Sequence, residues 1–203
     1  MEKNSDDVDI ASLRSRWSSY DGQQILEKLF SEKMQLADMR SAMEAAKKRF
    51  EIVDIRAVDF SEKDLSHHFL LFDLDLSYSN FSNAKIQGSF QNSTMRNCKF
   101  DSAEIIGGFF AGANLAASTF KGSVIQDADF ENALLPSVSF ENALLVGVGF
   151  QNTDLTSANF TGAHFGRVKF GNTKLLKTKE LYEAISQSET VLNAEGIVWV
   201  ERS

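Results

Sequence analysis

The sequence contains almost no cysteine or proline. A single cysteine, Cys98, among 203 residues excludes an intramolecular disulfide framework and favours a reducing compartment. A single proline argues against a chain built on proline turns. No run of about 18 uncharged apolar residues is present, so no membrane span is expected. The acidic start, MEKNSDDVDI, is unlike a secretory signal. These absences predict a cytoplasmic protein.

Positive charge is also scarce. The chain has 21 basic and 28 acidic side chains, a net charge of −7 and a pI near 5.0. This balance argues against direct binding of nucleic acid through phosphate contacts. Phenylalanine, in contrast, is abundant, with 17 residues against two tryptophans and three tyrosines. Hydrophobic residues make up 43% of the chain, which is enough to form one core, and the spacing of the phenylalanines predicts its form.

Large apolar residues recur at every fifth position from Phe90 to Leu175. Every tenth residue from 90 to 170 is phenylalanine. A helix repeats every 3.6 residues, a strand every 2 and a coiled coil every 3.5, so none of them produces this period. Two residues before each centre, from Gly88 to Thr173, every residue is uncharged and no larger than valine or threonine. Each quintet therefore has one large and one small inward side chain, and it must stack on neighbours, as in a solenoid.

The pattern resembles the pentapeptide-repeat family, whose consensus is Ala-(Asp/Asn)-Leu/Phe-X-X. The closest matches are Ala113-Asn114-Leu115, Ala128-Asp129-Phe130 and Ala158-Asn159-Phe160, with Thr153-Asp154-Leu155 as a variant. The resemblance covers about residues 55–175. It implies an all-β solenoid, a right-handed quadrilateral β-helix in which four quintets make one square coil and the coils stack through short parallel ladders. Residues twenty apart then lie above one another on one face.

Two shifts interrupt the frame near its beginning. Ile55, Phe60 and Leu65 fit the frame, but the next centres, starting with Leu71, stand one residue late. An insertion is therefore expected within residues 66–70. The four-residue step from Ile86 to Phe90 restores the frame by a deletion. Bulges or a small corner loop are the expected result.

Helices are predicted at both ends, where a solenoid exposes apolar centres and unpaired edges. We predict a helical N-terminal cap over residues 1–50, a β-helix over 51–176, and a C-terminal helix and terminal segment over 177–203. The predicted helix starts are Asp9 as N-cap of a helix with Ile10, Leu13 and Trp17, an Asp21/Gln24 capping box, and Thr178 before Leu181 and Ile185. Helical spacing also joins Leu36, Met39, Met43, Ala46 and Phe50. The apolar run 197–200 fits either a lid or a homodimer contact.

No catalytic, cofactor or metal constellation is apparent, so we expect a protein that is not an enzyme. His67 and His68 flank the insertion without a cysteine at metal-ligand spacing, and His164 falls on an outward position. Cys98 takes a small inward position, where apolar surroundings raise a thiol pKa.

Function is therefore expected on the surface. One face, centred on Ile105, Ile125, Leu145 and Phe165, has apolar outward neighbours. With Phe109 near its edge, the candidate protein interface is Ile106, Phe109, Val124, Leu144 and Val146, for a protein partner of unknown identity or a second copy. Outward β-branched residues also favour strand backbone by themselves, which leaves this interpretation open.

An acidic interface is the alternative, formed by Asp101, Glu104, Asp127, Asp129, Glu131 and Glu141. The resembled family includes proteins that mimic duplex DNA and protect type II topoisomerases from inhibitors. Duplex DNA has about one charge per 1.7 Å of axis. Residues 90–165 contain seven acidic and three basic side chains, a net of −4, which is a thin band for such mimicry. The same charges also fit a solvated surface that keeps the rod soluble.

Overall fold

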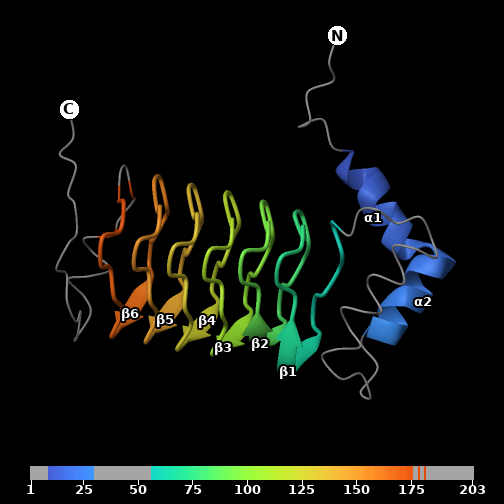
Figure 1. The fold of residues 1–203 in the computed structure, drawn as a ribbon, viewed down its shortest axis with the longest axis horizontal. Helices are drawn as coiled ribbons and strands as arrows, with labels where there is room; N and C mark the ends of the chain where they lie inside the picture. The colour runs from blue at the N-terminus through green and yellow to red at the C-terminus, as the bar shows by residue number, and fades with distance from the viewer. Residues whose placement is uncertain (1–8, 30–55, 176–177, 179–180, 182–203) are drawn as a thin grey trace, which may run out of the picture.

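The chain winds into a rod of stacked coils, with two helices at one end (Figure 1). A computed structural model describes residues 9–29, 56–175, 178 and 181. Its helices are α1 (Ile10–Ser18) and α2 (Tyr20–Leu29). Its strands are β1 (Asp64–Leu70), β2 (Lys85–Ser89), β3 (Glu104–Ile106), β4 (Val124–Gln126), β5 (Leu144–Val146) and β6 (His164–Gly166). The predicted all-β solenoid is confirmed.

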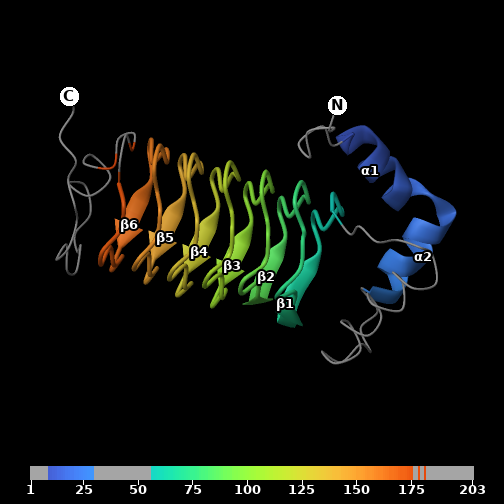
Figure 2. The ribbon, with the colours of Figure 1, turned by 45° about the horizontal axis from the view of Figure 1, so that its top comes forward.

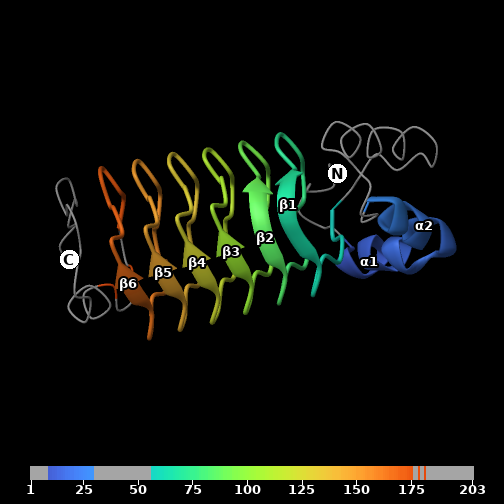
Figure 3. The same ribbon diagram turned by 90° about the horizontal axis from the view of Figure 1, so that it is seen from below.

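One face of the rod is a parallel sheet in the order β1-β2-β3-β4-β5-β6. We call the outer side of this sheet the strand face; it is seen from below in Figure 3. The other faces are held by single parallel bridges, such as Phe109 to Asp129 on the second face, Leu134 to Asp154 on the third and Ser139 to Asn159 on the fourth. From β3 onward, ladder partners in successive coils are twenty residues apart, as the repeat predicts.

The predicted frame is confirmed in the core. All eighteen centres from Phe90 to Leu175 are buried, none of them more than 6% exposed. Phenylalanine rings of the second face stack along the rod, with Phe110 and Phe130 centroids 4.7 Å apart. Rings of the fourth face do the same, with Phe100 and Phe120 4.6 Å apart. The two columns meet edge to face, since Phe120 and Phe130 lie at 86°.

The small inward positions also satisfy buried backbone groups. Ser118 Oγ accepts a hydrogen bond from Cys98 N at 3.0 Å and donates one to the Met95 carbonyl at 2.8 Å. Thr173 Oγ1 donates to the Phe150 carbonyl at 2.6 Å. A buried polar group without a hydrogen-bond partner lowers the stability of the fold. These hydroxyls are tolerated because they bond to the neighbouring coil.

Each corner is formed by a residue with positive φ, two positions after the centre. Seventeen successive corners, from Asn92 to Asn172, have this conformation. Eleven of them are glycine or asparagine, the residues that enter the left-handed region most easily. This position was not singled out from the sequence, although its composition was a usable signal.

The two frame shifts fall in neighbouring strands and compensate each other. β1 pairs with β2 at Leu65–Ile86 and again at Phe69–Gly88, so four steps in β1 match two in β2. The predicted irregularity is therefore a β-bulge within β1. β1 and β2 are also the longest strands, with seven and five residues against three in the others (Figure 3).

Both helices lie at the β1 end of the rod (Figure 2), and α1 packs against the first coil. Trp17 of α1 is 4% exposed and belongs to the same apolar cluster as Val58 and Phe60. Its Nε1 donates to the Arg56 carbonyl at 2.8 Å. This packing fits the predicted lid.

Asp9 caps α1 as predicted, because its carboxylate accepts from Ser12 N at 3.2 Å. The predicted Asp21/Gln24 capping box is wrong. α2 begins at Tyr20, and Ser19 Oγ accepts from Gly22 N at 3.1 Å, so Ser19 takes the capping role. The alternative was available in the sequence, since serine caps as well as aspartate does.

Leu181, predicted to face inward, is buried. Other predictions lie outside the described residues: Ile55 in the frame, the helix through Leu36 and Phe50, Ile185, and the run 197–200.

Candidate functional site

Four aliphatic side chains lie on the strand face. Ile106 is 41% exposed and Leu144 38% exposed, while Val124 and Val146 are half-buried. Val124 is the ladder partner of Leu144, so these two side chains are adjacent. Leu144 and Val146 point outward on either side of buried Leu145, because side chains alternate along a strand. The result is a continuous apolar group on the neighbouring strands β4 and β5.

The other apolar candidates are spread more widely. Ile106 is separated from Val146 by Gln126, which pairs with both. Phe109, at 51% exposure, lies on the second face between its bridge partners Ser89 and Asp129, around the corner from Ile106. Phe109 is therefore not part of the strand face. Leu134, exposed on the third face, also lies apart.

The acidic candidates are distributed over the strand face, the second face and the fourth face. Asp101 and Glu141 lie on the fourth face, on either side of Lys121. Lys121 Nζ is 3.1 Å from Glu141 Oε2, and the Lys121 amide donates to Asp101 Oδ1 at 3.0 Å. Asp101 also accepts from Thr119 Oγ1 at 2.6 Å. Glu104 is the exposed first residue of β3 on the strand face.

Several acidic side chains stabilise the turns of the coil. On the second face, Asp129 Oδ1 accepts from Glu131 N at 2.8 Å, and Asp127 forms the preceding corner with φ +49°. On the third face, Asp154 accepts from Thr156 N at 2.9 Å and is 3.0 Å from Lys174 Nζ. Partial burial raises the pKa of the Asp154 carboxyl, but the hydrogen bonds from Thr156 and Lys174 outweigh it and hold the pKa below its usual value. These acids have local roles, and they do not form one dense negative band.

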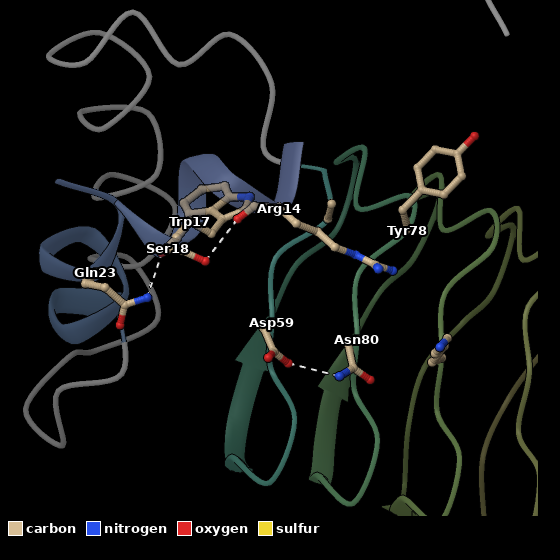
Figure 4. Close-up of a pocket in the computed structure, with 9 residues that line it drawn as sticks. Arg14, Trp17, Ser18, Gln23, Asp59, Tyr78 and Asn80 are labelled. Carbon is tan, nitrogen blue, oxygen red and sulfur yellow. Dashed lines mark hydrogen bonds between the residues drawn. The ribbon is translucent and has the colours of Figure 1, made fainter. Parts of the chain in front are cut away.

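A pocket of about 340 Å³ lies between α1, the start of α2 and the first coils (Figure 4). Arg14 extends over the coils toward Tyr78 and Asn80. Asp59 Oδ1 accepts from Asn80 Nδ2 at 3.1 Å. The lining residues are Arg14, Trp17, Ser18, Gln23, Ala57, Asp59, Tyr78, Asn80 and Lys99. They include two cations, one carboxylate and no cysteine or histidine, and that carboxylate, Asp59, is bonded to Asn80.

The residues considered for chemistry remain apart. His164 is exposed on β6, and Cys98 is buried, with burial raising the pKa of its thiol. His67 and His68 lie within β1. In the described ranges, no three histidine, cysteine, aspartate or glutamate side chains are grouped closely enough to hold a metal ion. Among the same residues, no helix has the length and apolar character required to cross a bilayer.

Part of the repeat region matches a known protein family. Residues 107–179 match a family described as "Pentapeptide repeat region". No curated protein matches the chain.

Three solved structures are similar in fold. HetL of the cyanobacterium Nostoc, described as involved in heterocyst differentiation regulation, is 13% identical, covers 72% of this chain and 92% of its own, and has a TM-score of 0.28. Rfr23 of the cyanobacterium Cyanothece is 15% identical, covers 66% and 99%, and has a TM-score of 0.30. A trypsin-treated variant of QnrB1, a plasmid-mediated fluoroquinolone resistance protein, is 14% identical, covers 61% and 72%, and has a TM-score of 0.27. Similarity at this level does not identify a partner.

Proposed function

This chain belongs to the pentapeptide-repeat family through residues 107–179, and we propose that it is a non-enzymatic scaffold that binds a protein partner through the strand face. The supporting observation is the aliphatic group formed by Val124, Leu144 and Val146, with Ile106 nearby, on a regular stacked sheet. Single exposed apolar residues are ordinary, whereas a contiguous group on a flat face is typical of an interaction site.

Rigidity supports the same conclusion. The backbone of the strand face is bonded to a coil on each side, and the side chains beneath it, such as Ile125 and Leu145, are fully buried. A partner that binds here meets a preformed surface, so little of the binding free energy is lost in ordering the scaffold. Binding therefore needs only a complementary apolar patch on the partner.

The proposal is tested by placing two carboxylates on the patch. We expect Leu144→Asp combined with Val146→Asp to reduce recovery of bound proteins from an extract of the source cells at least tenfold, because the charges would be buried against apolar partner atoms. Leu134→Asp on the third face is the control, since Leu134 is also exposed, 48% against 38% for Leu144, and lies outside the patch. Identical recovery with the double variant and the wild type would refute the proposal.

A second candidate is that the rod binds a type II topoisomerase in place of DNA. It is supported by the net charge of −7 and by Asp127, Asp129 and Glu131 in a single coil. The distribution of the remaining acids over three faces, and the ion pairs formed by Glu141 and Asp154, make this support weaker. We expect no inhibition of supercoiling when the purified protein is added to a bacterial gyrase. Inhibition, or protection of the gyrase from a quinolone, would instead establish the second candidate.

A further inference from the structure

The outward side chains of β3 to β6 form two columns on the strand face. In each column, the residue on β3 is complementary to the residue on β6, and the residue on β4 faces the residue on β5 when the order of the strands is reversed. The first outward column contains Glu104, Val124, Leu144 and His164, one on each successive strand. It begins with a carboxylate, ends with an imidazole and has two aliphatic residues between them. The second outward column contains Ile106, Gln126, Val146 and Gly166. It has a large exposed side chain at one end and no side chain at the other.

These columns define one favourable way to place two copies face to face. A two-fold axis can lie in the interface, parallel to the strands and between β4 and β5. Such an axis reverses the rod, so β3 of one copy opposes β6 of the other and β4 opposes β5. It preserves the direction of the strands, so each column faces the same column of the other copy. A two-fold interface must be self-complementary, which these columns allow.

We infer that the partner of the strand face is a second copy of this chain, in a reversed, face-to-face pair; this inference rests on the proposed function. In this pair Val124 opposes Leu144 of the other copy, and Gln126 opposes Val146. Glu104 opposes His164, whose ring presents an N–H donor to the carboxylate in either protonation state. Both polar groups at the edge of the patch thereby gain a partner.

Ile106 opposes Gly166 in the same arrangement. Gly166 leaves a shallow depression beside Val146 of the neighbouring strand, since a Cβ placed on this glycine would lie 3.5 Å from Val146 Cγ2. The exposed side chain of Ile106 fits this depression, and its burial removes apolar surface from water. This pairing thus accounts for both the exposed Ile106 on β3 and the glycine at the opposing position of β6.

The other face-to-face arrangement is less favourable. An axis parallel to the rod keeps each strand level with its own copy and makes the first column face the second. Glu104 would then face Ile106, and a carboxylate would be buried against an aliphatic side chain without a donor. Electrostatic and steric fit therefore select the reversed pair.

The expected association is weak. Four strands spaced by about 4.8 Å give a contact roughly 19 Å long, and the face is only three residues wide. Stable complexes generally bury about 1,200–2,000 Å² in total, and this contact is at or below the lower limit. We therefore expect a concentration-dependent dimer whose dissociation constant is on the order of micromolar or weaker, since micromolar is already the weak end for interfaces of standard size.

Charge reversal and restoration test the pairing. In sedimentation equilibrium, we expect Glu104→Lys alone and His164→Glu alone each to weaken self-association at least tenfold. The chain with both changes should return to within about threefold of the wild type, because the introduced lysine would again face an acid. Gly166→Arg should abolish the dimer by filling the depression, and Leu134→Asp should leave it unchanged. Both paired positions are exposed, so folding should be retained.

Cross-linking tests the reversed geometry. We expect a short bismaleimide, about 8 Å long, to join a Glu104→Cys copy to a His164→Cys copy when the two are mixed. Glu104→Cys alone should give little product, since two copies of β3 would be three strand spacings, about 14 Å, apart along the rod. Buried Cys98 does not compete, because the apolar core keeps its thiol protonated and covered.

Three results would overturn the inference. They are a monomer up to about 0.5 mM, a dimer indifferent to the Glu104, His164 and Gly166 changes, and equal cross-linking of mixed and single samples. If the chain stays monomeric while Leu144→Asp with Val146→Asp still removes a captured protein, the second-copy inference fails and the proposed function stands. If neither self-association nor capture depends on the patch, both fail.

Discussion

Phe130→Ala is expected to lower the free energy of unfolding by about 3–5 kcal/mol, since a large buried side chain would leave a cavity in a closed stack. Phe130 has no exposed surface. Its ring stacks on Phe110 at 4.7 Å and on Phe150 at 5.3 Å, and it meets Phe120 and Phe140 edge to face. The backbone on both sides is fixed by ladders, so the surrounding coils have little freedom to close the cavity.

Denaturant unfolding followed by circular dichroism measures this loss. Glu131→Gln is the control, because the neighbouring side chain is exposed and its exchange should change the free energy by less than about 0.5 kcal/mol. A rod of repeats can unfold in stages, so coincidence of the transition at two wavelengths should be checked before a single free energy is assigned. Similar losses for the two variants would contradict the inward frame.

The coil and its core could be predicted because they depend on a local rule. A large residue at each fifth position, with a small one two places earlier, leaves only one way to bury both in every quintet. The rule even located the disturbance near Leu65, since a shift of frame has to be absorbed where it occurs. It did not reveal that the insertion in β1 and the deletion in β2 meet in one bulge, because that depends on the pairing of the two strands.

The corner conformation does not follow from the inward positions of the repeat. It follows from the residues two places after each centre, most of which are glycine or asparagine. Asn92 and Asn172 begin and end a series of positive-φ residues that their composition indicates. The hydroxyl bonds are different in kind, because the partner of Ser118 is the carbonyl of Met95, in the preceding coil. Such a bond depends on the size of the coil as well as on the repeat.

The candidate surface was predictable only in part. Residues twenty apart stack on one face, which brought Val124 and Leu144 together correctly. Phe109 was placed near the edge of this face but lies on the second face, because the corner at Gly107 separates it from Ile106. The complementarity of Glu104 with His164 depends on the register of four strands, and the pocket beside Arg14 depends on where α1 packs. Neither is contained in the repeat.

Gly108→Val is expected to lower the free energy of unfolding by about 2–3 kcal/mol through overpacking. Gly108 is the small inward residue of its quintet, and a Cβ there would lie 2.8 Å from both Ile105 Cγ2 and Phe110 Cε2. Both neighbours are fully buried and held by the coils on either side, so neither can move away easily. Thermal and denaturant unfolding of the variant would measure the effect.

The adjacent Gly107 is the matched control, because two consecutive glycines are required for opposite reasons. Gly107 has φ +66° and open space around its absent Cβ, so the backbone conformation, and not a lack of space, restricts which residues fit there. Gly107→Asn should therefore reduce stability by less than about 1 kcal/mol, since asparagine tolerates the left-handed region. A greater loss at Gly107 than at Gly108 would mean that backbone conformation, and not the space between stacked rings, limits which residues this coil accepts.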